Sequence, residues 1–329
     1  MRQPYVDNYE RIEAAGILAA DEKLYDYSDD ERKDAYDDLF ESANEFLQQQ
    51  AKAQGFPPCF FYFRRDDSVN AFAISQKKYK RIAFTHGMVE ALYDYFEQKE
   101  DLLQEAEFSD LHNVLAPYQN PYSYNFFQFW QMFTTYHEYA HLVQRGRNSE
   151  FSYAEFDSGK PGDILESHAL ELDADFLAAS QLAINILEEM RDSAGNLKRD
   201  PGDLQVLCSI ALASAFIFFM KTAGGLKGLY FQENEHPHPY VRIAFLSNIM
   251  LDTIQKNAPD LPFDSRACVN RALDIAEKIM DGDYKDPAQT FKAEFGKHFD
   301  PIINHLVGVV EKMKTMPNLC YNLPPDRLP

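Results

Sequence analysis

Two histidines four residues apart, with a glutamate directly after the first, are the residues of this chain best suited to chemistry. They are His137, Glu138 and His141. Residues four apart lie one above the other on a helix, so the two imidazoles can ligate one zinc ion. Zinc lowers the pKa of a bound water toward neutrality, and a neighbouring carboxylate can take its proton. The pattern predicts a zinc site with Glu138 as general base.

A catalytic zinc takes three protein ligands and keeps one position open, so a third ligand is needed. Residues 125–143 contain no proline or glycine and are apolar at helical spacing, which predicts a buried helix. Gln144 and Arg147 stand where some zinc peptidases have a glycine and a third histidine, which excludes that arrangement. The plain alternative is that both histidines are hydrogen-bonded core residues and Glu138 faces solvent.

A second predicted helix follows, because residues 163–166 are typical of an N-cap with its capping-box partner. Glu171 and Asp175 fall one turn apart on this helix. We expect Glu171 to be the third ligand and Asp175 to hold the ring nitrogen of a ligating histidine. His168, three residues before Glu171, is the rival ligand, or else a surface or second-shell histidine. Asp173 is expected to be a solvated charge.

Together these residues resemble the gluzincin metallopeptidases, in particular the CAAX prenyl endopeptidase and HtpX-like family with its HExxH and later ExxxD. The similarity covers about residues 57–250, in the family's order. Its other parts are the edge-strand segment Asn70, Ala71, Phe72, Ala73 and Ile74, the strand-then-helix element at residues 81–92, and the His-Pro segment at residues 236–243. The resemblance implies a predominantly helical α+β, zincin-like fold with a small sheet beside the metal-binding helix.

The resemblance also implies an activity, the hydrolysis of peptide bonds in a protein substrate with one Zn²⁺ per chain. His236 is then expected to donate to the oxyanion, with His238, Tyr240 and Arg242 as neighbours. The plain alternative for the histidines is a rigid, proline-bracketed turn before a helix. The strand at residues 70–74 would bind extended substrate along its edge. The competing hypotheses are a catalytically weak zinc-binding regulator that docks a partner, and a purely structural helical protein.

Members of that family are usually embedded in a membrane, whereas this chain has no convincing membrane-spanning segment. Its most apolar run is residues 206–220. As a helix this run would be about 22 Å long, against about 30 Å for the hydrocarbon core of a membrane. The connection between the strand-then-helix element at residues 81–92 and the predicted zinc-binding helix is also longer than is usual in the family. We therefore expect a buried helix here and a soluble relative of the family, comparable to the phage-exclusion peptidase Lit or the ImmA-like peptidases, with no stable membrane insertion.

Composition agrees with a soluble enzyme. The formal net charge of −20 argues against nucleic acid or an anionic membrane as a partner, because both are polyanions. The polar, acidic N-terminus predicts neither a secretory signal nor a transit peptide, so a cytoplasmic location is expected. Four scattered cysteines, Cys59, Cys208, Cys268 and Cys320, are expected to be free thiols.

Breaks and periodicity predict three ranges along the chain. Residues 1–56 form an N-terminal helical extension, residues 57–255 the zincin-like domain, and residues 256–329 a C-terminal helical extension with a tail. Strands are expected at residues 59–63, 70–74 and 81–84, and a helix at residues 265–280.

Overall fold

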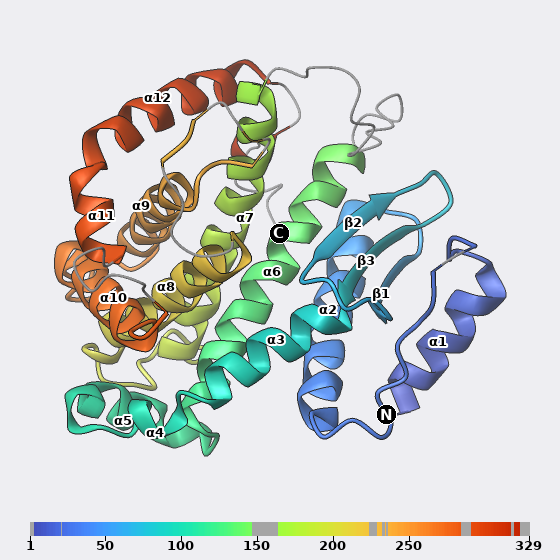
Figure 1. Ribbon diagram of the computed structural model, residues 1–329, viewed down its shortest axis with the longest axis horizontal. Coiled ribbons are helices and arrows are strands. Elements are labelled where there is room, and N and C mark those ends of the chain that lie inside the picture. The colour runs from blue at the N-terminus through green and yellow to red at the C-terminus, as the bar shows by residue number, and fades with distance from the viewer. Residues whose placement is uncertain are drawn as a thin grey trace.

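A small three-stranded sheet stands at one side of a mostly helical body in the computed structural model of this chain (Figure 1). The structure describes residues 3–20, 22–146, 164–223, 229–231, 234, 236–283, 291–316 and 319–322. The elements in the described part are α1 (Gln3–Ala15), α2 (Lys33–Gln54), β1 (Cys59–Arg64), β2 (Ala71–Ser75), β3 (Lys80–Thr85), α3 (His86–Glu97), α4 (Glu100–Leu103), η1 (Ala106–Phe108), α5 (Ser109–Leu115), η2 (Ala116–Tyr118), α6 (Tyr122–Gly146), α7 (Ile164–Met190), α8 (Asp203–Thr222), α9 (Pro239–Asn257), α10 (Ser265–Ile279), α11 (Phe291–Lys297), α12 (Phe299–Thr315) and η3 (Cys320–Asn322). The prediction of a predominantly helical α+β fold is confirmed.

The sheet has the strand order β1-β3-β2, so β2 lies at an edge. β1 runs parallel to the central strand β3, and β2 runs antiparallel to it. β3 is buried along its whole length, as expected for a strand with neighbours on both sides. All three predicted strands are present within one residue at their starts, and Asn70 comes directly before β2. β2 packs against α6, which brings the edge of the sheet beside the helix of the two histidines.

α6, α7, α8 and α9 form the helical centre of the molecule. α6 packs against α7 and α8, and α7 packs against α9. α8 is apolar on all sides, and it is the one helix in the described residues that is long and apolar enough to span a membrane. However, 83% of its most apolar window is buried inside the protein. The prediction of a buried helix at residues 206–220 is confirmed, and such burial is what a core helix requires.

One main hydrophobic core includes residues from all three predicted ranges. Tyr5 of α1 and Leu47 of α2 belong to it, as do Ile275 of α10 and Cys320 of η3. The N-terminal helices pack on β1, and α12 packs on α7 and α9, so both expected extensions form walls of the same core. The helix expected at residues 265–280 is α10, and all four cysteines are free and buried.

Candidate metal centre

Three ligand atoms converge where α6 meets α7. The Nε2 atoms of His137 and His141 lie 3.2 Å apart. Each of these nitrogens lies 3.6 Å from a carboxylate oxygen of Glu171. Zinc bonds to nitrogen and oxygen at about 2.0–2.2 Å, which for tetrahedral geometry places neighbouring ligand atoms roughly 3.4 Å apart. The three side chains are buried, and they can therefore hold a metal ion with shifts of a few tenths of an ångström.

His137 is oriented by a carboxylate and an arginine on two other helices. Its Nδ1 lies 3.0 Å from Oδ1 of Asp175, on α7. Arg242, on α9, donates to both carboxylate oxygens of Asp175 at 2.8 and 2.6 Å. The guanidinium lies 4.2 Å from the centre of the Phe219 ring, on α8. Because Asp175 accepts at Nδ1, the Nε2 lone pair of His137 is directed at the ligand group.

Protonation of the ligands follows from the same contacts. Burial by itself lowers the pKa of His137. The hydrogen bonds with Asp175 and Glu171 have the opposite and larger effect, so the pKa is raised to about 10. Burial raises the pKa of Glu171, whereas hydrogen bonds from His137 and His236 bring it well below its ordinary value. The carboxylate is therefore ionised, and a metal ion that binds here displaces a proton from His137.

Glu138 comes directly after the first ligand on α6, and it is buried, with 7% of its surface exposed. Its charge acts on Arg242: burial lowers the pKa of the guanidinium, but the carboxylates of Asp175, Glu171 and Glu138 raise it above its ordinary value. The alternative in which Glu138 faces solvent does not fit this position.

His141 is held by Gln144, whose Oε1 lies 2.9 Å from its Nδ1. Gln144 in turn donates to Asp173, on α7. The expectation of a solvated charge at Asp173 is wrong, because this side chain is fully buried. Its partners include backbone N–H groups near the C-terminal end of the chain, which sequence spacing does not reveal. The contact between Gln144 and His141 could have been predicted from the sequence, since Gln144 lies one turn after His141 on the same helix.

One histidine of the His-Pro segment lies beside the candidate ligand Glu171, and the other shapes the local backbone. His236 places its Nδ1 3.3 Å from Oε2 of Glu171, and its side chain is 59% exposed. His238 is the N-cap of α9, where its Nδ1 accepts a hydrogen bond of 3.1 Å from the N–H of Tyr240. The rings of His238 and Tyr240 pack against one another. The turn hypothesis therefore describes His238, while His236 lies at the candidate metal centre.

His168 lies outside the group of three ligands. Its Nδ1 is 3.0 Å from Nε2 of His305, on α12, and its Nε2 is 2.9 Å from the carbonyl oxygen of Asn234. The ring is fully buried, so it is no surface residue. Glu166, in the first turn of α7, pairs with Lys312 at 3.4 Å. The expected N-cap at Asp163 is outside the described residues.

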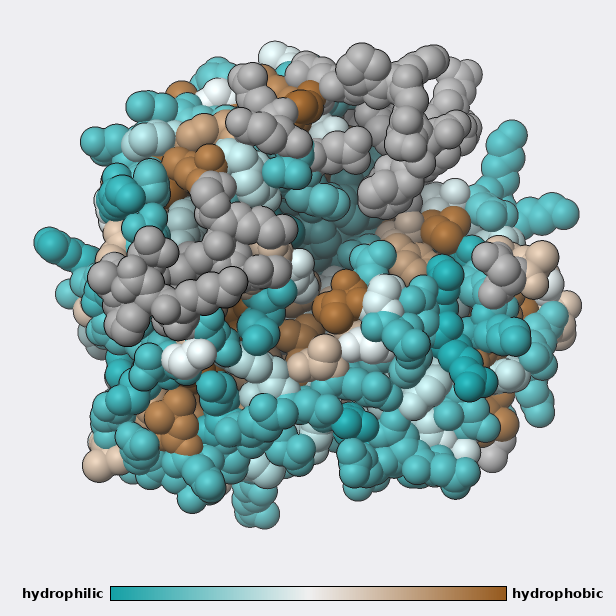
Figure 2. Space-filling view, in the orientation of Figure 1, coloured by the Kyte–Doolittle hydropathy of each residue, from teal (hydrophilic) through white to brown (hydrophobic). Residues whose placement is uncertain are grey.

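The edge strand β2 is tied to α6, the helix of the two histidines, by a buried lysine. Lys80 donates to Oγ of Ser75, at the end of β2, at 2.6 Å and to the carbonyl oxygen of Leu142, on α6, at 3.1 Å. Leu142 directly follows the second histidine. Figure 2 shows a hollow near the centre of this face with hydrophilic residues at its floor, over the C-terminal half of α6 and between β2 and α7. The segment at residues 70–74 thus borders the side of the molecule where the ligands lie.

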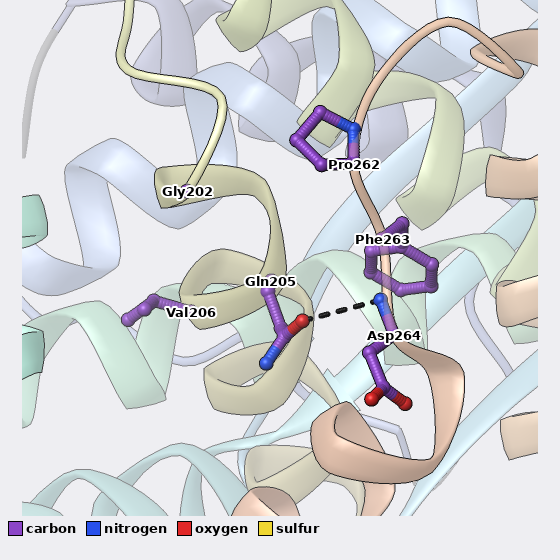
Figure 3. Close-up of a pocket in the computed structure, with 6 residues that line it drawn as sticks. All are labelled: Gly202, Gln205, Val206, Pro262, Phe263 and Asp264. Atoms are coloured by element: carbon purple, nitrogen blue, oxygen red, sulfur yellow. Dashed lines mark hydrogen bonds between the residues drawn. The ribbon is translucent and has the colours of Figure 1, made fainter.

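A separate pocket of about 480 Å³ lies between the start of α8 and the segment before α10 (Figure 3). Gln205 accepts there from the N–H of Asp264 at 3.3 Å, and Asp264 caps α10 through the N–H of Ala267. The polar groups labelled in this view thus serve helix ends, so the pocket offers no second candidate for catalysis.

No family model, no curated protein and no solved structure matches this chain.

Proposed function

We propose that this protein is a zinc-dependent endopeptidase, a soluble and cytoplasmic relative of the gluzincin peptidases, that hydrolyses peptide bonds of an intracellular protein. One observation carries the proposal: His137, His141 and Glu171 direct their ligand atoms at a common point, within 4.8 Å of one another, with Glu138 between the two histidines. Two imidazoles and a carboxylate are a ligand set of catalytic zinc sites, which keep a fourth position open. Spacing and chemistry both fit one Zn²⁺ per chain.

When bound, Zn²⁺ would polarise the peptide carbonyl and lower the pKa of the attacking water. Glu138 takes the proton of that water and returns it to the leaving amine. His236, exposed beside Glu171, donates a hydrogen bond to the developing oxyanion. Asp175 keeps the proton of His137 on Nδ1, and Arg242 fixes Asp175 with two hydrogen bonds.

The substrate is a protein chain in an extended conformation, and the edge of β2 is the place for it. An extended peptide can add to a sheet edge through main-chain hydrogen bonds, and β2 packs directly on the metal-binding helix. The net charge of −20 disfavours nucleic acid and anionic membranes as partners.

The test combines metal analysis with the exchange Glu138→Gln. The wild type should contain about one zinc per chain and cleave an unfolded protein substrate. Glu138→Gln should retain the zinc and lose hydrolysis, because an amide cannot accept the proton. Glu166→Gln, which changes a partly exposed carboxylate of α7 to an amide, should behave like wild type, since Glu166 contacts Lys312 and not the ligands. Comparable turnover by Glu138→Gln would refute the peptidase proposal.

The position of His236 favours a second candidate, a catalytically weak zinc-binding regulator. A histidine nitrogen 3.3 Å from a ligand oxygen could take the fourth position, and a zinc with four protein ligands is structural. His236→Phe separates the two. A peptidase variant keeps its zinc and turns over more slowly, whereas a regulator variant loses zinc affinity and no form of the protein cleaves peptides.

A further inference from the structure

Gln144 fixes the tautomer of His141, the second of the two histidine ligands. Its side-chain nitrogen donates to the carbonyl oxygen of Leu170 at 3.0 Å and to Oδ2 of Asp173 at 2.7 Å. Both partners are acceptors, so the amide is oriented with its oxygen toward His141, 2.9 Å from Nδ1. Nδ1 of His141 must therefore carry the proton, and Nε2 keeps its lone pair for a metal. The orientation of Gln144 decides which nitrogen of His141 is the ligand.

Asp173 supplies the acceptor that orients Gln144, and it depends on distant backbone groups to do so. The carboxylate is fully buried. It accepts from Gln144, from the N–H of Cys320 at 2.9 Å and from the N–H of Tyr321 at 2.7 Å. A buried carboxylate is stable only when donors satisfy it. Two of these three donors belong to η3. With η3 in place, Asp173 is therefore held as an acceptor that faces Gln144.

η3 is held in place by contacts of its own on two helices. The Tyr321 ring packs edge-on against Phe176 of α7, with ring centres 5.3 Å apart. The side chain of Asn322 donates to the carbonyl oxygens of Met313 and Met316, at the end of α12, at 2.8 and 2.7 Å. Cys320 is buried in the main core. These contacts leave the two backbone N–H groups directed at Asp173.

We propose that η3 sets the metal affinity of the site, by positioning His141 through Asp173 and Gln144. The inference rests on the proposed zinc centre and adds a segment that regulates its affinity for the metal. Loss of the η3 donors leaves the buried carboxylate short of partners, frees Gln144 to turn, and removes the acceptor that keeps the proton of His141 on Nδ1. Outer partners of metal ligands typically change metal affinity about 10–100-fold when they are lost.

The full-length chain offers a matched pair of variants, Tyr321→Pro and Tyr321→Ala. Both remove the ring that packs on Phe176, but proline also deletes the N–H that donates to Asp173. Proline fits at the second position of a short 3₁₀ turn, as Pro117 shows in η2 of this same protein. A third variant, Gln144→Met, keeps a long unbranched side chain at residue 144 and removes its hydrogen bonds.

Zinc affinity is measured by competition with a chelator, and the visible spectrum of the cobalt-substituted protein reports ligand geometry. Tyr321→Pro and Gln144→Met should bind zinc about 10–100-fold more weakly than wild type and shift the cobalt spectrum. Tyr321→Ala should stay near wild type in both measurements. If the proline variant fails to fold, the other variants still test the proposal. Gln144→Met tests whether Gln144 affects metal binding. Asp173→Asn removes one acceptor oxygen and tests whether Asp173 connects η3 to the site.

This design distinguishes a failure of the proposed function from a failure of the proposed role of η3. A wild-type protein that binds no stoichiometric zinc would refute the proposed function itself. A wild type that binds zinc, with Tyr321→Pro or Asp173→Asn equal to Tyr321→Ala in affinity and spectrum, would overturn the role of η3 alone.

Discussion

Two clusters of buried charge in this protein differ in what their atoms face. On the sheet, Arg81 of β3 donates to Glu22 at 2.6 Å and to the hydroxyl of Tyr62 at 2.8 Å, and that hydroxyl donates to Glu22 at 2.6 Å. Between α6 and α7, two imidazole nitrogens and a carboxylate face one another at 3.2–3.6 Å. The first cluster (Glu22, Tyr62, Arg81) is called the sheet cluster below, and the second (His137, His141, Glu171) the ligand cluster.

The difference shows that buried charge alone does not mark a functional site. In the sheet cluster the carboxylate of Glu22 meets the positive charge of Arg81 and the hydroxyl of Tyr62 directly, so its negative charge is matched by donors of the protein. In the ligand cluster, three groups that can each offer a lone pair point at one place, which is the arrangement a cation requires. The sheet cluster is therefore expected to act on stability, and the ligand cluster on metal binding.

The largest expected effect is the loss of stability from breaking the sheet cluster. Arg81→Met leaves Glu22 buried without its cation, and removal of one partner of a buried pair typically costs about 3–5 kcal/mol. Urea unfolding measures this cost, while the zinc content should not change. Arg64→Met is the control, because Arg64 pairs with Asp66 near the surface, where a pair contributes about 0–1 kcal/mol. Similar losses of stability in Arg81→Met and Arg64→Met would mean that the buried pair contributes no more than the pair near the surface.

The second prediction concerns stabilisation of the ligand cluster by zinc. A ligand at a hundredfold excess over its dissociation constant stabilises the folded state by about 2.7 kcal/mol. Thermal unfolding with and without a chelator should show this gain in wild type and in Arg81→Met. Glu171→Ala should lose it, because a ligand is gone, whereas His168→Ala should keep it, because His168 faces His305. A gain that survives in Glu171→Ala and disappears in His168→Ala would make His168 the third ligand.

Much of the architecture around the ligand cluster follows from local sequence. The periodicity of apolar residues, and the residues that interrupt helices and strands, located α6, α7 and the three strands, because each of these elements carries its own apolar pattern. Burial distinguishes α8 from a membrane span. The apolar run of 15 residues was expected to be too short, but the helix has 20 residues and is long enough to cross a membrane. Four-residue spacings placed His137 with His141 on one helix face and Glu171 with Asp175 on another, since helix geometry fixes which residues share a face. The expectation that the two pairs meet came from the need of a zinc site for a third ligand.

The rest depended on contacts between distant segments. Asp173 meets its backbone donors 147 and 148 residues further along the chain. Glu22 and Arg81 are 59 residues apart, and His168 and His305 are 137 apart. No local pattern encodes such partners, so a carboxylate that ends in the core has the same appearance in the sequence as one on the surface.

The smallest expected effect is the pH dependence that the sheet cluster gives to stability. Burial raises the pKa of Glu22, but hydrogen bonds from Tyr62 and Ala19 and the charge of Arg81 lower it below its ordinary value of 4.5. Glu22 therefore stabilises the fold fully above that value, and its contribution is lost as the pH falls through the lower, folded-state pKa. The free energy of unfolding of wild type minus that of Glu22→Gln, measured in urea, should be constant between about pH 7 and pH 5.5 and shrink below about pH 4.5. A difference that grows on acidification would mean that Glu22 is held protonated, and that the sheet cluster is no ion pair.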